Sequence, residues 1–326
     1  MPIRRLLPAV VCLLALTACG SPSATPTPSA PASSATASAS PSASPSASAV
    51  VQTSLDGIKV TGAMGKAPKV TFTKPFVIDK TRTRVLVEGK GNPALADGYV
   101  TINYSGTNGR DGAAFDSSFS RGKPATFPLS GVIVGFKTGL TGQKAGSRVL
   151  LAIPSSEGYG ETGSSDGSIK AGDTLIFVVD ILAVSTANPE GKTITPPAGL
   201  PTVTGGATDK PTVTMPGTSA PTAMTAQTLI EGTGAKITKT DTIYARFVGY
   251  SWKTGKLIHD QWTPIDGALS STIPGWQTGL VGKTVGSRVL LVLPPADGYP
   301  NGANNPPLEK GDTIVYVVDI LFAYAA

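Results

Sequence analysis

The sequence predicts an α+β fold that occurs twice in the chain, each time as an antiparallel β-sheet wrapped around one short α-helix. Residues 130–160 and 270–300 are identical at 16 of 31 positions at a constant offset of 140, which indicates two copies of one domain. The first copy contains many runs rich in valine, isoleucine and threonine, which are typical of strands, and only one clear helical pattern.

Length and charge agree with two ordinary domains and argue against nucleic-acid binding. The chain has 326 residues, 15% of them charged, and a formal net charge of +6 without any cluster of lysine and arginine. We expect domain 1 at residues 51–186, a Pro-rich linker at 187–200 and domain 2 at 201–326. The charge pattern therefore favours a partner other than nucleic acid.

Residues 1–19 have the composition of an export signal. Arg4 and Arg5 precede a short apolar core, Leu6–Leu16, that is too short for a stable membrane span. The following Leu-Thr-Ala-Cys resembles a bacterial lipobox, which implies lipidation of Cys19 and an anchor on the extracytoplasmic face of the cell membrane. An ordinary signal peptide with an incidental cysteine is the alternative.

The cysteine count leaves little other cysteine chemistry. Cys12 lies in the segment that would be discarded, and Cys19 would carry the lipid. We therefore expect no disulfide, thiolate nucleophile or cysteine metal site. Residues 20–50, almost entirely Gly, Ser, Pro, Ala and Thr, are predicted to be a disordered tether that holds the domains off the membrane.

The elements of domain 1 can be placed in order along the chain. Alternating or continuous apolar runs predict strands, and Gly/Asn/Asp clusters predict the turns between them. The predicted strands are Val70–Phe76, Arg84–Glu88, Tyr99–Tyr104, Arg148–Ile153 and Leu175–Leu182. Copy two closes with a matching strand, Thr313–Phe322.

The one helix is predicted between Val132 and Leu140. Apolar residues there recur at helical spacing, and we expect Gly139 and Gly142 to end the helix. With the following strand and the loop residue Tyr159, this helix could form a pocket. The alternative is that Phe136 and Tyr159 belong only to the core.

The order of motifs in copy one, from about Arg84 to Val184, resembles an FKBP-type peptidyl-prolyl cis-trans isomerase domain. The motifs appear here as VTINYSG, FDSS, Lys-Pro with a downstream Phe, GVIVGFKTGL, the Gly-Ser-Arg strand, EGYG and DTLIFVVDIL. The resemblance implies two FKBP-like domains and an enzyme that needs no metal and no cofactor. An unrelated β domain in which these aromatics are only core is the alternative.

The resemblance also implies a pocket in copy one. The positions that match the family's catalytic residues are Tyr104, Phe115, Asp116, Ile133, Tyr159 and Phe177, and those that match its substrate-binding residues are Phe127, Val132, Phe136 and Ile169. Phe136 replaces the family's usual Trp, and Ala125 replaces a frequent aromatic. The loop that contains Ile169 departs from the family pattern.

Copy two departs from this set. We align Phe247 with Tyr104, His259-Asp260 with Phe115-Asp116, Thr272 with Val132 and Tyr316 with Phe177, while Trp276 restores the usual floor and Tyr299 is kept. His259 is the only histidine of the chain. It either weakens the pocket as a polar substitution or makes it pH-sensitive. We expect domain 2 to be weakly active or inactive.

The resemblance therefore predicts an isomerase that accelerates rotation about X–Pro bonds of unfolded or proline-containing exported polypeptides, with macrolides as possible inhibitors. A non-enzymatic chaperone or peptide-binding surface module is the alternative. A solute-binding lipoprotein is disfavoured because two large α/β lobes are absent from the predicted elements. A single histidine also disfavours a Ser-His-Asp hydrolase.

Overall fold

The computed structural model describes residues 50–325. The predicted export signal, the predicted lipidation site Cys19 and the predicted tether up to residue 49 lie outside the described residues. Among residues 50–325, no helix combines the length and the apolar character needed to cross a membrane.

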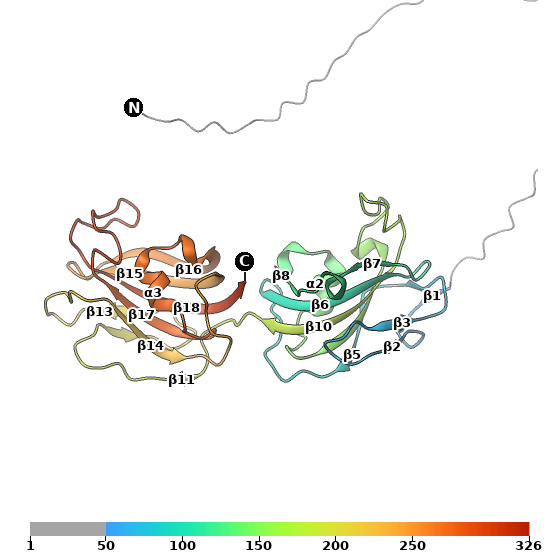
Figure 1. Cartoon of the computed structure of the whole chain (residues 1–326), viewed down its shortest axis with the longest axis horizontal. Coiled ribbons are helices and arrows are strands. Elements are labelled where there is room, and N and C mark those ends of the chain that lie inside the picture. Colours follow the sequence, from blue (N-terminus) through green and yellow to red (C-terminus); the bar gives the residue numbers. More distant parts are fainter. Residues whose placement is uncertain (1–49, 326) are drawn as a thin grey trace, which may run out of the picture. The chain divides into compact units, whose positions relative to one another are not determined.

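Domain 1 is built on a six-stranded antiparallel sheet (Figure 1). The strand order is β5-β9-β10-β6-β7, and β8 also pairs with β6. The elements are β1 (Val51–Gln52), β2 (Lys59–Thr61), β3 (Lys69–Thr71), β4 (Val77–Ile78), β5 (Arg82–Val87), β6 (Tyr99–Asn108), β7 (Ala114–Ser117), α1 (Ser118–Arg121), β8 (Ala125–Pro128), η1 (Leu129–Gly131), α2 (Val134–Leu140), β9 (Arg148–Ile153), η2 (Ser155–Glu157) and β10 (Leu175–Val184).

Domain 2 repeats this plan with the strand order β11-β14-β17-β18-β15-β16. Part of the segment predicted as a linker joins its sheet, because β11 pairs with β14. The elements are β11 (Lys192–Thr193), β12 (Thr202–Thr204), β13 (Thr212–Thr214), β14 (Thr225–Glu231), β15 (Asp241–Ser251), β16 (Leu257–Ala268), η3 (Leu269–Ser271), α3 (Pro274–Leu280), β17 (Arg288–Leu293) and β18 (Ile314–Ala325). The predicted α+β fold is confirmed.

Both faces of each sheet are buried, which explains the continuous apolar runs. In β9, Val149, Leu151 and Ile153 pack in one cluster with Phe136 of α2. Successive side chains of a strand point to opposite faces. Leu150 accordingly packs in a second cluster on the other face, with the segment that precedes the sheet.

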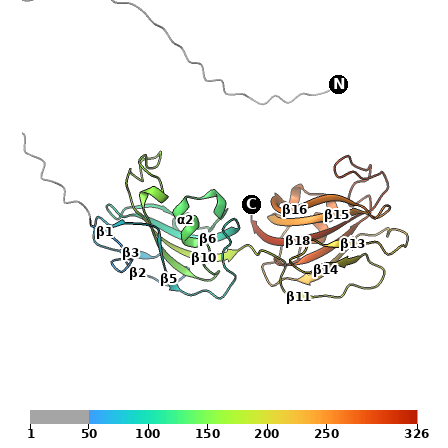
Figure 2. The ribbon, with the colours of Figure 1, turned by 180° about the vertical axis from the view of Figure 1, so that it is seen from behind.

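We call the segment that covers this second face of domain 1 the first strap, residues 51–78. Its strands β2 and β3 form a two-stranded sheet and lie beside β5 in both views (Figure 1, Figure 2). Leu55, Ile58 and Phe76 of the strap are at most 5% exposed. The second strap, residues 200–215, contains β12 and β13 and covers the corresponding face of domain 2 through Val203 and Val213.

A buried ion pair holds each strap on its sheet. The Arg148 and Asp180 side chains are 2% and 0% exposed and bond each other side by side. The Arg148 guanidinium also donates to the Gly62 and Lys66 carbonyls at 2.9 Å, and Gly65 N–H donates to Asp180 at 2.8 Å. The ion pair thereby fixes the turn between β2 and β3.

Domain 2 has the equivalent ion pair with one addition. Arg288 bonds Asp319 and donates to the Gly206 carbonyl of the second strap at 2.8 Å. Arg246 also donates to Asp319, at 2.9 Å, and lies over the Trp262 ring. Two arginines therefore share the buried Asp319 carboxylate, whereas Asp180 has one.

One predicted helix stop is wrong. Gly142 follows α2 with a φ of +81°, as expected for a residue that ends a helix. Gly139, however, lies inside α2 and is buried. A Cβ at Gly139 would lie 2.2 Å from Leu151 Cδ2, so this glycine permits close contact between helix and sheet. The predicted strand Val70–Phe76 forms only in part, because β3 ends at Thr71 and the next strand, β4, begins at Val77.

Candidate active site

Domain 1 has a cavity of about 710 Å³ between α2 and the curved sheet. It is mostly aromatic at its floor and polar at its rim. The lining residues are Tyr104, Phe115, Asp116, Phe127, Gly131, Val132, Ile133, Phe136, Tyr159, Ser164, Ser165, Asp166, Ser168, Ile169 and Phe177. All ten residues that the resemblance assigned to the site therefore face one cavity, and their individual roles stay a prediction.

The floor of the cavity is a cluster of rings centred on Phe177. Phe177 comes from β10, and its ring meets Phe136 of α2 at 5.0 Å and Phe115 of β7 at 5.4 Å, both edge to face. Phe127 of β8 extends the cluster with a ring 6.1 Å from Phe136. Phe136 and Phe177 are each 6% exposed. These side chains form both the core and the pocket, so the two alternatives for Phe136 are not exclusive.

One wall of the cavity carries a polar network around Tyr104. The Tyr104 hydroxyl donates to Asp116, and Arg121 forms an ion pair with the same carboxylate. Arg121 Nη2 also donates to the Tyr104 hydroxyl at 2.8 Å. The network places a carboxylate and a phenol beside the aromatic floor, with the cation behind them.

The pKa values of Tyr104 and Asp116 shift in opposite directions. Burial, followed by the hydrogen bond to Asp116, raises the pKa of Tyr104. Burial acts to raise the pKa of Asp116, but hydrogen bonds from Tyr104 and Arg121 outweigh it and lower that pKa. Around neutral pH the site therefore holds a neutral phenol and an ionised carboxylate.

Arg121 is a site residue that the sequence interpretation missed. Helix α1 is a single turn that ends at Arg121, and it returns this side chain to Asp116, five residues earlier. The signal was a short Ser-Phe-Ser-Arg-Gly turn directly after the Phe-Asp-Ser motif, with Gly122 at a φ of +72°.

Two hydrogen-bonding groups at the mouth of the cavity have no partner within residues 50–325. The Ile133 N–H precedes the first turn of α2 and meets no acceptor there. The Tyr159 hydroxyl also has none, and this side chain is 41% exposed. Ile169, in contrast, is only 4% exposed and closes the cavity between loop and core. A bound peptide could satisfy both free groups.

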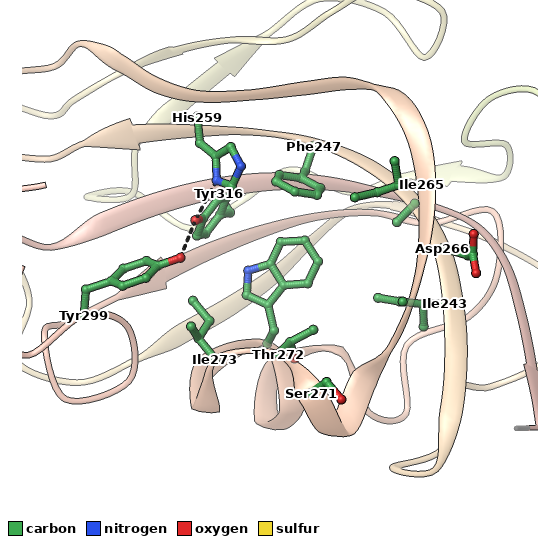
Figure 3. A pocket seen from close by; sticks show the side chains of 13 residues that line it. Ile243, Phe247, His259, Ile265, Asp266, Ser271, Thr272, Ile273, Tyr299 and Tyr316 are labelled. Atoms are coloured by element: carbon green, nitrogen blue, oxygen red, sulfur yellow. Dashed lines mark hydrogen bonds between the residues drawn. The ribbon is translucent and has the colours of Figure 1, made fainter. Parts of the chain in front are cut away.

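Domain 2 has a smaller cavity, about 280 Å³, in the corresponding place. Figure 3 shows Phe247, His259 and Tyr316 close together on one side of this cavity, with Tyr299 beside Tyr316. Trp276 also lines the cavity. The Trp276 and Phe247 rings meet at 4.8 Å, and Trp276 and Tyr316 at 5.4 Å. The floor is thus more densely filled by aromatic rings than in domain 1.

The strand register corrects the predicted alignment of His259-Asp260 with Phe115-Asp116. In domain 1, Gly106 pairs with Asp116, and Phe115 is the extra residue of a bulge. In domain 2, Gly249, which is equivalent to Gly106, pairs with His259. His259 therefore stands where Asp116 does. The bulge residue equivalent to Phe115 is Ile258, which packs against the core of domain 2 as Phe115 does in domain 1.

This register gives the second pocket a different polar network. His259 Nδ1 lies 3.2 Å from the Tyr316 hydroxyl, which lies 3.5 Å from the Tyr299 hydroxyl (Figure 3). Burial lowers the pKa of His259 and, with the bond to Tyr299, raises that of Tyr316. Asp260 does not line the cavity and pairs with Lys210 of the second strap instead. An imidazole and two phenols therefore replace the carboxylate, phenol and guanidinium of domain 1.

Comparison with known proteins identifies both sheets with one family. The family model described as FKBP-type peptidyl-prolyl cis-trans isomerase matches residues 90–182 and 234–321, which is more than half of the chain. The straps lie outside both matches.

Individual proteins of known name are similar to parts of the chain. A probable FK506-binding protein of Corynebacterium glutamicum is 39% identical over 98 residues, which are 30% of this chain and 81% of that protein. An FK506-binding protein of Streptomyces anulatus is 42% identical over 99 residues, 30% of this chain and 80% of that protein. The solved structure of FkpA from Escherichia coli is 38% identical with a TM-score of 0.30, covering 32% of this chain and 47% of that chain.

Proposed function

Because this chain belongs to the FKBP-type peptidyl-prolyl cis-trans isomerase family, we propose that domain 1 is its catalytic domain and acts on X–Pro bonds of exported polypeptides. We also propose that domain 2 has weak or no activity. The observation that supports this assignment is the network of Tyr104, Asp116 and Arg121 beside the aromatic floor. Domain 2 has Phe247 and His259 at the first two of these positions.

The reaction needs a pocket rather than a nucleophile. Rotation about an X–Pro bond is slow because amide resonance is lost, with a barrier of about 18–20 kcal/mol. The twisted amide separates less charge than the planar one, so an apolar pocket favours the twisted form. Every 1.4 kcal/mol of that preference accelerates rotation about tenfold. The ring cluster around Phe177 supplies such an environment.

We assign the roles in domain 1 as follows. Phe136 and Phe177 hold the prolyl ring from below and behind. The free Ile133 N–H donates to one substrate carbonyl, and the free Tyr159 hydroxyl donates to the neighbouring one. Asp116, held by Tyr104 and Arg121, orients the twisted carbonyl electrostatically.

Domain 2 suits binding better than turnover. Its cavity keeps an aromatic floor and Tyr299, so a prolyl or other apolar side chain can enter. It has no carboxylate at the position of Asp116, because His259 stands there and bonds Tyr316. This observation favours a non-enzymatic peptide-binding role for domain 2 as a second candidate function.

The assignment of activity to domain 1 is tested in the full chain with matched variants of the two domains. Phe177→Ala and Asp116→Asn should lower the isomerisation rate of an Ala-Pro peptide at least tenfold, whereas Tyr316→Ala and His259→Asn should leave most of it. Circular dichroism checks that each variant is folded, and Asp116→Asn, at a half-buried wall position, preserves the core. Loss of turnover in the domain 2 variants, with unchanged turnover in the domain 1 variants, would reverse the assignment.

We also propose that the protein is anchored by a lipid on Cys19 outside the cytoplasm. The Leu-Thr-Ala-Cys sequence after an apolar run, and the Ser/Pro/Ala-rich tether behind it, support this location. The test is detergent phase partitioning of the protein from cells. The wild type should partition into detergent and Cys19→Ser into the aqueous phase; equal partitioning of both would disprove the anchor.

A further inference from the structure

The loop that follows Tyr159 presents one carboxylate in a fixed orientation. Asp166 Oδ1 accepts hydrogen bonds from Ser164 Oγ at 2.5 Å, from Ser168 Oγ at 2.8 Å and from Ser168 N–H at 3.1 Å. Asp166 Oδ2 has no hydrogen-bond partner within residues 50–325. One oxygen of the carboxylate is therefore held by the loop, while the other is free for a ligand.

The loop itself is tied to the rest of the domain. Ser164 N–H donates to the Ile169 carbonyl, and Ile169 N–H donates back to Ser164 Oγ. Asn108, at the end of β6, donates from Nδ2 to the Ser168 carbonyl at 2.8 Å. Ile169 is buried in the core. These bonds fix the position of Asp166 relative to the cavity that it lines.

The rim of the cavity carries a net negative charge. Asp116 and Asp166 line it, and no lysine or arginine does. Arg121 neutralises Asp116 through an ion pair, but within the described part of the chain no cation pairs with Asp166. The hydrogen bonds from Ser164 and Ser168 lower the pKa of Asp166 to about 2, so it is ionised at any physiological pH.

Domain 2 has no such charge on this side of its cavity. The corresponding loop contributes only Tyr299 to the lining. The one acid in that lining is Asp266, which belongs to β16 and not to the loop. A fixed carboxylate on the loop therefore distinguishes the cavity of domain 1 from that of domain 2.

We propose that Asp166 makes domain 1 selective for polypeptides that carry a lysine or arginine next to the proline, with Oδ2 as the acceptor for the basic group. This inference rests on the proposed catalytic role of domain 1. With the prolyl ring on the aromatic floor, the neighbouring side chain reaches the rim, where its apolar stem can lie along the ring of Tyr159 while its charged end stays in water. The carboxylate adds attraction for a basic group and repulsion for an acidic one.

The expected selectivity is modest because Asp166 is exposed to solvent. Solvent-exposed ion pairs change an equilibrium by about two- to fivefold, and salt screens them. Peptides that differ only next to the proline should therefore show a kcat/KM about fivefold higher for Lys than for Glu at low ionic strength. At about 0.5 M salt the ratio should approach one.

The experiment uses the full chain and two series of peptides, in which Lys, Ala or Glu stands either before or after the proline. Exchange spectroscopy measures the isomerisation rate of each peptide. Asp166→Asn is the test variant, because Asn Oδ1 can keep all three loop bonds while the charge is removed. Glu161→Gln is the matched control: it makes the same charge change in the same loop at an exposed residue that does not line the cavity. The readout is the Lys to Glu ratio of kcat/KM.

We expect the ratio to fall to about one in Asp166→Asn and to stay at the wild-type value in Glu161→Gln. An unchanged ratio in Asp166→Asn, an equal fall in both variants, or turnover without any Lys to Glu difference in the wild type would each overturn the inference. If no peptide is turned over, the proposed catalytic role fails instead. The ratio of dissociation constants for the Lys and Glu peptides, with the same two variants, then decides the inference.

Discussion

Replacing Arg148 by Met should strongly destabilise domain 1, because the substitution leaves Asp180 charged and buried. The two side chains are 2% and 0% exposed. Without the guanidinium, the carboxylate keeps only the Gly65 N–H, and the carbonyls of Gly62 and Lys66 lose their donor. Removing one partner of a buried ion pair costs about 3–5 kcal/mol. For a domain of this size that loss lowers the midpoint of thermal unfolding by about 10–20 °C.

Calorimetry and urea unfolding of the full chain measure this loss. Arg82→Met is the matched control, since Arg82 pairs with Asp79 at the surface, with side chains 28% and 34% exposed. We expect little or no loss of stability there, because solvent screens an exposed pair. Arg288→Met in domain 2 should be milder than Arg148→Met, because Arg246 still bonds the Asp319 carboxylate.

One further variant separates charge burial from packing in the same site. Arg148→Met combined with Asp180→Leu should recover much of the lost stability, since apolar residues of similar volume can replace a buried pair. The loss of Arg148 should also expose the turn at Gly62 to proteases, because the Gly62 carbonyl has lost its donor. A loss in Arg148→Met no larger than that in Arg82→Met would refute the reasoning.

Two other predictions concern single positions. The sole histidine, His259, should titrate below the usual histidine pKa of about 6.5, because burial disfavours its charged form. Since its pKa is lower in the folded than in the unfolded state, the stability of the protein should fall as the pH drops through about 6.5. This pH effect should be absent in His259→Gln. The proton resonances of His259 report the midpoint directly, and a midpoint above 6.5 would contradict the assignment. Gly139→Ala should destabilise domain 1 by about 1–3 kcal/mol through overpacking against Leu151, in spite of the better helix propensity of alanine. The exposed neighbour Thr138→Ala should have little effect on urea unfolding, and equal behaviour of the two variants would argue against the contact.

Local patterns were sufficient for much of the fold. β9 begins and ends where its apolar run does, because both faces of that strand are covered and every position is buried. Strand β10 and helix α2 were also predicted within about two residues at each end, the usual uncertainty of such boundaries. These elements are strongly patterned, and a proline follows β9 while a glycine follows α2 within two residues.

Features that depend on pairing between distant segments could not be predicted in this way. The register of β15 and β16 decides that His259 replaces Asp116, and a single bulge shifts the alignment by one residue. Arg148 and Asp180 lie 32 residues apart, and only the register of β9 and β10 places them side by side. The sequence does not point to Asp166, because its importance depends on which of its carboxylate oxygens accepts the hydrogen bonds from Ser164 and Ser168.

The Trp276 floor of the second pocket gives the intact protein a built-in optical asymmetry. All three tryptophans of the chain, Trp252, Trp262 and Trp276, belong to domain 2, and domain 1 has phenylalanine at the matching floor position. Indole emission should therefore respond to a ligand in the pocket of domain 2 and not to one in the pocket of domain 1. Unfolding followed by this emission would record only half of the molecule, and the two domains can be told apart without cutting the chain.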